Sequence, residues 1–456
     1  MKPRELLSLL AAAGTFIAVL SMAPAVLGGA RPALRLGQIL PGLSIAFEVE
    51  PLGLLFALVA SCLWVVSVVY SIGYMRGNDE RHQARFYLCF ALAIGAALGV
   101  AFSGNLLTLY LFYELLTFVT YPLVTHHGDE NARHGGRTYL GLLLLSSMFF
   151  LLPAMIATWW LAGTLDFTPG GVLGGKVAGP AAAGLLALYA FGIGKAALMP
   201  LHRWLPAAMV APTPVSALLH AVAVVKAGVF AIVKVVVYTF GLDFGADAFG
   251  WLPWVAGFTV IAASVIALRA DNLKRRLAYS TVSQLSYVVL AAAILAPLSL
   301  VGAVLHIAAH AFGKITLFFA AGAVYTAAHK TKVSQLDGIG RRMPWTMAAF
   351  AVGALSLIGI PPAAGFLSKW FMFQGAAQGG HWLALIVLSA STVLNAAYFV
   401  PILYRAFFVK SCDESHGEAP ASMVAAMVFT AGTTLILPFA AALPLELART
   451  VAGAAP

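Results

Sequence analysis

Nearly the whole chain is a succession of apolar stretches, each long enough to cross a lipid bilayer as a helix. Of its 456 residues, 61% are hydrophobic and 10% are charged, whereas a soluble domain has about 25% charged residues. A helical span needs roughly 20 mainly apolar residues. The sequence therefore predicts an all-α polytopic membrane protein with about 13–14 transmembrane helices. The predicted spans are 5–28, 50–74, 85–103, 104–126, 137–163, 180–212, 214–238, 250–269, 273–297, 301–327, 345–377, 382–409 and 421–443.

Two of these spans contain helix-breaking prolines: Pro200 in 180–212, and Pro361 and Pro362 in 345–377. Proline removes a backbone donor and clashes with the preceding helical turn. A break at membrane depth is tolerated only where the freed backbone faces protein or water. Both breaks are therefore expected to mark an internal site.

The two broken spans occupy matching positions in two halves of five spans, residues 85–238 and 250–410. Because five is odd, consecutive halves should have opposite orientations, which predicts two inverted repeats. Residues 1–84 would add N-terminal spans, and 411–456 a C-terminal span and tail. Basic residues gather in alternate loops, which predicts a cytoplasmic N-terminus and an external C-terminus.

Ionisable side chains lie inside the apolar spans, where a charge costs at least about 2.5–3.5 kcal/mol. The candidates for a proton path are Glu114, Lys195, His220, Lys226, His306, His310, Lys314 and Lys369. The last two histidines and Lys314 are spaced four apart, so they should form one stripe along a helix face. A row of this kind indicates a path for protons or cations.

Other classes of site are not indicated. Cys62, Cys89 and Cys412 are far apart and form no CxxC motif, which argues against iron–sulfur and structural zinc sites. No nucleotide-binding loop is visible. Two histidines on one helix face cannot supply both axial ligands of one haem. We therefore expect no metal, no cofactor, no catalytic redox residue and no nucleic-acid partner, the net charge of +10 being explained by the loop bias.

Four motifs carry a resemblance to a known family: GIGKAALMPLHRWLP with the following SALLHAVAVVKAG, DNLKRRLAYSTVSQLSY, LHIAAHAFGKITLFFAAG and LIGIPPAAGFLSKWF. Together they resemble the proton-conducting, antiporter-like subunits shared by NADH–quinone oxidoreductase (complex I), Mrp-type multisubunit Na⁺/H⁺ antiporters and membrane-bound hydrogenases. The resemblance covers roughly residues 45–410. Family members commonly have fourteen spans, one more than is counted here.

The resemblance implies roles for single residues. Glu114 would pair with Lys195 on the first broken helix, so that the carboxylate keeps the lysine charged until the two separate. His220 and Lys226 would be central relay sites, and Lys369 the terminal one. His202, beside the first break, is a candidate for proton uptake. Each role has a structural alternative. Glu114 and Lys195 could form a static ion pair, and His220 could be an ordinary core histidine. Lys369 could extend its amine to the membrane interface.

Three functions compete. The favoured one is a Mrp D-type, proton-translocating subunit of a monovalent cation/H⁺ antiporter, with Na⁺ or K⁺ as the exchanged ion. The second is a pump subunit of a redox complex of the NADH–quinone oxidoreductase or hydrogenase type. The third is a non-conducting structural subunit. Each implies other membrane subunits and lipid as partners, and a bacterial inner membrane as the location.

Overall fold

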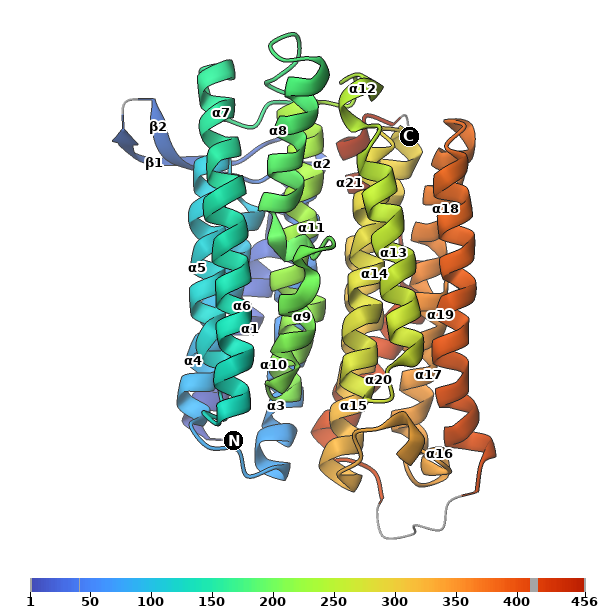
Figure 1. Ribbon diagram of the computed structural model, residues 1–456. Coiled ribbons are helices and arrows are strands. Elements are labelled where there is room, and N and C mark those ends of the chain that lie inside the picture. The colour runs from blue at the N-terminus through green and yellow to red at the C-terminus, as the bar shows by residue number, and fades with distance from the viewer. Residues whose placement is uncertain (1, 41, 411–416, 455–456) are drawn as a thin grey trace.

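A computed structural model describes residues 2–40, 42–410 and 417–454, and they form one large helical bundle (Figure 1). The α-helices are α1 (Pro3–Ser21), α2 (Ala23–Leu27), α3 (Pro51–Gly77), α4 (Gln83–Ala101), α5 (Leu106–Val124), α6 (Glu130–Ser146), α7 (Leu152–Ala162), α8 (Gly179–Gly192), α9 (Trp204–Ala207), α10 (Thr213–Ala217), α11 (Val224–Lys234), α12 (Ala246–Phe249), α13 (Leu252–Arg269), α14 (Leu273–Ala293), α15 (Pro297–Ala328), α16 (Ile339–Arg342), α17 (Pro344–Ile358), α18 (Ala364–Gln378), α19 (Trp382–Phe408), α20 (Ala421–Ile436) and α21 (Ala442–Ala452).

The prediction of an all-α polytopic membrane protein is confirmed. Within the described ranges, nine helices are long and apolar enough to cross a bilayer, and three shorter apolar helices accompany them. Every predicted span coincides with one or more of these elements. The N-terminus and the C-terminus lie at opposite ends of the bundle (Figure 1), as an odd number of crossings requires.

A short β-hairpin was not predicted. Strands β1 (Ala33–Leu40) and β2 (Leu43–Glu48) pair antiparallel, with Ala33 opposite Glu48. An ion pair of 2.8 Å joins Arg35 on β1 to Asp166. The hairpin projects from the side of the bundle, nearer the end that holds the C-terminus (Figure 1).

Two elements form the centre of the bundle: the continuous stretch Thr213–Phe240 and helix α15. In their most apolar windows every residue is buried, whereas only 17% of the corresponding window is buried in the N-terminal span. The first stretch is α-helical in α10 and α11 and has π-helical turns at Leu218–Val222 and Val235–Phe240. The lysines and histidines within these two windows are therefore enclosed by protein.

The two proline-containing spans are interrupted helices. Helix α8 ends at Gly192, and the chain continues through short 3₁₀ turns past Pro200 to α9. Helix α17 ends at Ile358, and α18 begins at Ala364, with Pro361 and Pro362 between them.

Glycines on neighbouring elements let the backbone approach at both breaks. A Cβ on Gly228 of α11 would lie 2.3 Å from the carbonyl carbon of Lys195, and one on Gly365 of α18 would lie 1.8 Å from the carbonyl oxygen of Ser356. No real side chain fits at these distances. Glycine is therefore required at each position for the broken segment to pack against its neighbour.

Candidate functional site

The first break holds Lys195 against α5. Its amine donates hydrogen bonds to the carbonyl oxygen of Tyr113 at 2.7 Å and to Oγ1 of Thr117 at 2.6 Å, and lies 3.2 Å from the centre of the Tyr113 ring. The Lys195 backbone N–H donates to the Tyr113 hydroxyl, and the Trp204 indole donates to the carbonyl of Gly194. The backbone freed by the break is therefore satisfied within the protein.

The predicted ion pair between Glu114 and Lys195 is not formed in this structure. Both carboxylate oxygens of Glu114 are buried, and among the described residues neither has a hydrogen-bond partner. The lysine is instead bonded to the carbonyl of Tyr113, the residue directly before Glu114. A backbone carbonyl and an aromatic face satisfy the amine here, which leaves the carboxylate available to a different partner.

Lys226 and His310 meet at the centre of the bundle. Nζ of Lys226 on α11 lies 2.7 Å from Nδ1 of His310 on α15, and both side chains are buried. The other ring nitrogen of His310 has no partner among the described residues, and neither has either nitrogen of His220, whose ring centre lies 4.8 Å from that of Phe318. These imidazoles are buried with unused proton-binding atoms, which a purely structural histidine rarely shows.

His306 continues the row toward the second break. Its ring centre is 5.8 Å from that of His310. Its Nδ1 lies 2.8 Å from the hydroxyl of Ser368 on α18, and its Nε2 lies 3.0 Å from Oε1 of Gln284 on α14. The imidazole of His306 on α15 is thus hydrogen-bonded to both α18 and α14.

Lys314 reaches the same region by a polar chain. Its amine donates to Oγ of Ser280 at 2.9 Å, and that oxygen also lies 3.0 Å from the hydroxyl of Tyr398. The Tyr398 hydroxyl is in turn hydrogen-bonded to the side-chain oxygen of Asn395. The sequence interpretation missed these three residues and Gln284, although polar side chains within apolar spans were a usable signal.

The second break ends this network at the carbonyl of Leu357. Lys369 donates to it at 2.7 Å and to the carbonyl of Ile358 at 3.0 Å, both at the end of α17. Gln284 and Asn395 also donate to the Leu357 oxygen, at 3.3 and 3.2 Å. A carbonyl that a continuous helix would have used internally therefore connects Lys369 to both polar chains.

His202 lies apart from this row. It occupies the 3₁₀ turn Leu201–Arg203, where its Nδ1 is buried without a partner in the described part of the chain and its ring centre is 6.0 Å from that of Tyr279. Nothing here connects it to Lys195 or to the central histidines, so a role in proton uptake stays a prediction.

A buried ion pair was also missed. Nζ of Lys234 lies 2.8 Å from Oε1 of Glu50, and the amine donates to the carbonyl of Ser103 at 2.6 Å. The side chains of Lys234 and Glu50 are 1% and 4% exposed, so this lysine lies inside the bundle. The pair joins the start of α3 to the end of α11.

No group of three or more metal-ligating side chains occurs in residues 2–40, 42–410 and 417–454. Cys412 lies outside these residues. The described side chains form two hydrogen-bonded groups on enclosed helices. One joins Lys226 to His310, and the other joins His306 through Gln284 and the Leu357 carbonyl to Lys369. The ring centres of His310 and His306, 5.8 Å apart, bring the two groups together.

Comparison with known proteins places this arrangement in a family. Residues 103–395 match the transmembrane family described as NADH:quinone oxidoreductase/Mrp antiporter, and residues 41–87 match the N-terminus of chain 5 of NADH–ubiquinone oxidoreductase (complex I). The first match covers more than half of the chain, including both breaks and the central row. The chain belongs to the NADH:quinone oxidoreductase/Mrp antiporter family.

Individual members of this family are clearly related to the chain. It is 35% identical over 378 residues to subunit N of the NADH-quinone oxidoreductase of Desulforudis audaxviator, a match covering 80% of the chain and 74% of that protein. It is 30% identical over 386 residues to chloroplast subunit 5 of the NAD(P)H-quinone oxidoreductase of Zygnema circumcarinatum, where it spans 53% of the relative. The chain thus spans only about half the length of its chain 5 relatives.

A solved structure shares the fold. A chain of the Mrp complex from Dietzia sp. superposes with a TM-score of 0.87 at 21% identity, covering 98% of this chain and 91% of that one. The relatives are membrane subunits of multisubunit complexes.

Proposed function

We propose that this chain is a proton-translocating subunit of a larger membrane complex. Protons would pass along the enclosed row of lysines, histidines and polar side chains between the two breaks. The observation that carries the proposal is the 2.7 Å contact between Lys226 and His310 on two helices buried along their whole apolar windows. Placing a lysine and a histidine in contact there is costly for stability, and both side chains can donate and accept protons.

The proposal includes the two inverted repeats and the orientation of the chain in the membrane. The two broken spans, at Lys195 and Lys369, would be equivalent elements of inverted halves, 85–238 and 250–410. The basic loops would face the cytoplasm of a bacterium, with the N-terminus inside and the C-terminus outside. The opposite placement of the two chain ends supports this (Figure 1).

Two host complexes compete. In a monovalent cation/H⁺ antiporter the chain would be a D-type subunit, and Na⁺ or K⁺ movement would accompany proton movement. In a redox complex it would be a pump subunit, and electron transfer in partner subunits would drive it. The 35% identity to a subunit N favours the second host, whereas the sequence analysis favoured the first.

The deciding experiment uses the intact complex, purified with its partners and reconstituted in liposomes that contain a pH-sensitive dye. Proton flux is started either by a Na⁺ or K⁺ gradient or by NADH and quinone, and the copurifying subunits are identified by mass spectrometry. Lys195→Ala should abolish flux, whereas Lys176→Ala, which alters an exposed lysine, should not. Wild-type flux in the Lys195 variant would refute proton translocation by this chain.

A further inference from the structure

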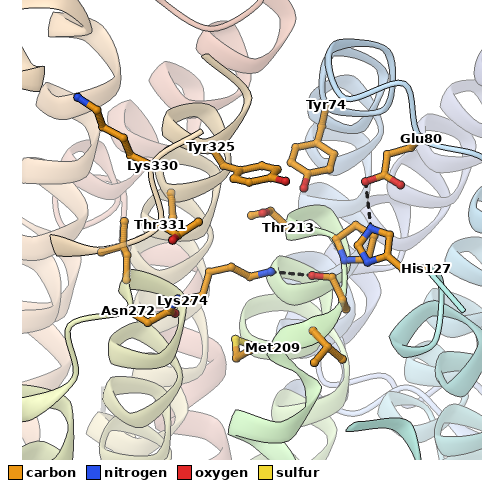
Figure 2. Close-up of a pocket in the computed structure, with 15 residues that line it drawn as sticks. Tyr74, Glu80, His127, Met209, Thr213, Asn272, Lys274, Tyr325, Lys330 and Thr331 are labelled. Atoms are coloured by element: carbon orange, nitrogen blue, oxygen red, sulfur yellow. Dashed lines mark hydrogen bonds and ion pairs between the residues drawn. The ribbon is translucent and has the colours of Figure 1, made fainter. Parts of the chain in front are cut away.

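A cavity of about 260 Å³, lined by both polar and apolar residues, opens at the end of the bundle where α3 ends and α14 begins. Its walls come from five separate parts of the chain: the end of α3 with the loop after it, His127 in the loop before α6, the segment Met209–Thr213, the start of α14, and the end of α15 with the loop after it (Figure 2). A site for one water needs roughly 10–15 Å³, so the cavity has room for several.

A carboxylate held by two imidazoles forms one side of this cavity. Glu80 lies 3.3 Å from Nε2 of His127 and 3.6 Å from Nε2 of His126. Burial of the carboxylate opposes its ionisation, but the two histidines outweigh burial and lower the pKa of Glu80 to about 2. The hydrogen bond to Glu80 also raises the pKa of His127. The group is therefore an anion with proton-binding sites on both sides.

Other polar groups face the same space. Lys274, at the start of α14, extends its amine to the carbonyl of Ala211 at 2.6 Å, and the hydroxyl groups of Tyr74, Tyr325 and Thr213 lie near one another across the cavity (Figure 2). The cluster of Glu80 and His127 and the Lys274 amine thus occupy different walls of one chamber.

The cavity reaches toward two residues of the proposed row. Thr213 on its wall is seven residues before His220 on the same continuous element, and Ala321 on its wall is seven residues after Lys314 on α15. Seven helical residues rise about 10 Å. The inner end of the cavity is therefore about two helical turns from each of these buried groups.

Tight packing separates the cavity from the row. The ring of Tyr70 stacks on that of Phe319 at 3.8 Å, and its hydroxyl donates to the Phe319 carbonyl at 2.7 Å. A Cβ on Gly322 would lie 2.3 Å from that hydroxyl and 2.7 Å from the side chain of Thr213. Protein atoms from α3, α10 and α15 are therefore in close contact between the cavity and the row.

We propose that this cavity is the water-filled access chamber through which protons reach His220 and Lys314. Glu80 with His126 and His127 collects protons at its mouth, and the layer of Tyr70, Thr213 and Gly322 opens and closes its inner end. This inference rests on the proposed function. It assigns proton uptake to the cavity between α3, the segment Met209–Thr213, α14 and α15 instead of to His202.

The test blocks the chamber chemically. In the reconstituted complex with Cys62, Cys89 and Cys412 replaced by serine, Met209→Cys places a thiol on the cavity wall, and His134→Cys places one at an exposed position near the start of α6, outside the cavity. Both variants are treated with a membrane-impermeant cationic thiol reagent. Labelling of the Met209→Cys variant should reduce proton flux at least about tenfold, and equal labelling of the His134→Cys variant should leave it unchanged.

Three results have distinct meanings. Full labelling of the Met209→Cys variant with normal flux overturns the chamber. Failure of the reagent to label this variant, while the His134→Cys variant is labelled, also overturns it, because a water-filled chamber must admit the reagent. Failure of the proposed function would appear separately, as flux that persists in the Lys195→Ala variant of the same preparation.

A second variant tests the role of Glu80 at the cavity mouth without attaching a reagent. Glu80→Gln removes the anion that holds the two histidines, and Glu130→Gln removes one on an exposed helix start nearby. When protons are scarce on the side of the membrane that the cavity faces, Glu80→Gln should slow flux several-fold and Glu130→Gln should not. Because the loss in Glu80→Gln should disappear as the pH on that side falls, a loss that is equal at all pH values would contradict proton collection at this site.

Discussion

The two broken helices place their lysines in different surroundings, although the sequence gives them matching positions. Lys195 bonds to a different helix, α5, through the carbonyl of Tyr113 and the hydroxyl of Thr117. Lys369 bonds within its own broken span, to the carbonyls of Leu357 and Ile358. Movement between helices can thus change the partners of Lys195, whereas Lys369 has a structural task at the end of α17 besides any transfer of protons.

The largest effect is expected from replacing each lysine by arginine, which keeps the positive charge but prevents release of the proton. Arginine keeps a positive charge but is not deprotonated in proteins, and a positioned proton-transfer group contributes roughly 10²–10⁴-fold to a rate. Lys195→Arg and Lys369→Arg should each reduce flux in the liposome assay by about a hundredfold or more, with Lys176→Arg as the control. Normal flux in the Lys369→Arg variant would mean that Lys369 only caps the end of α17 and transfers no protons.

Thermal stability, unlike flux, should differ between the alanine variants of the two lysines. Lys369→Ala leaves the Ile358 carbonyl without its donor, whereas Leu357 retains Gln284 and Asn395. An unsatisfied buried polar group costs about 1–3 kcal/mol. Lys369→Ala should therefore lower the thermal midpoint of the purified complex, at a fixed scan rate, below that of Lys195→Ala. Equal midpoints would show that the two breaks are supported alike.

Glu114 should show a smaller effect on flux. Because the structure contains no ion pair between Glu114 and Lys195, Glu114→Gln should slow flux by less than about tenfold, which corresponds to less than about 1.4 kcal/mol. Lys195→Ala in the same preparation gives the reference. A loss as great as that of the lysine variant would mean that a state with the ion pair closed is obligatory during transport.

The smallest expected effect concerns pH and stability outside the membrane spans. Glu80, with its pKa lowered to about 2, stabilises the fold above its ordinary pKa of 4.5 and loses this effect as the pH falls toward 2. His127, with its pKa raised from 6.5, stabilises below 6.5 and loses this effect as the pH rises through the raised value. The midpoint difference between wild type and Glu80→Gln should be greatest between pH 4.5 and 6.5. A difference that grows at alkaline pH would contradict this contact.

Some of the site was predictable because lone residues carry strong constraints. A lysine or histidine within an apolar span, or a proline that must interrupt a helix, is visible without any knowledge of its neighbours. His306 and His310, spaced four apart, were expected on one face and lie with ring centres 5.8 Å apart. Partners were not predictable. Gln284 on α14 and Asn395 on α19 are more than 100 residues apart in the sequence, and no periodicity indicates that both donate to the Leu357 carbonyl.

The sequence by itself determined that the chain is a membrane protein, where its spans lie, where two of them break and which charges are placed inside, because hydrophobicity, proline and charge act locally. The family followed from motifs. Only the tertiary structure decided that Lys195 bonds to Tyr113 and Thr117 rather than Glu114, that Lys234 pairs with Glu50, and that the Leu357 carbonyl gathers three donors. Those choices depend on which helices pack together, and a buried polar group takes whichever partner that packing brings within hydrogen-bond distance.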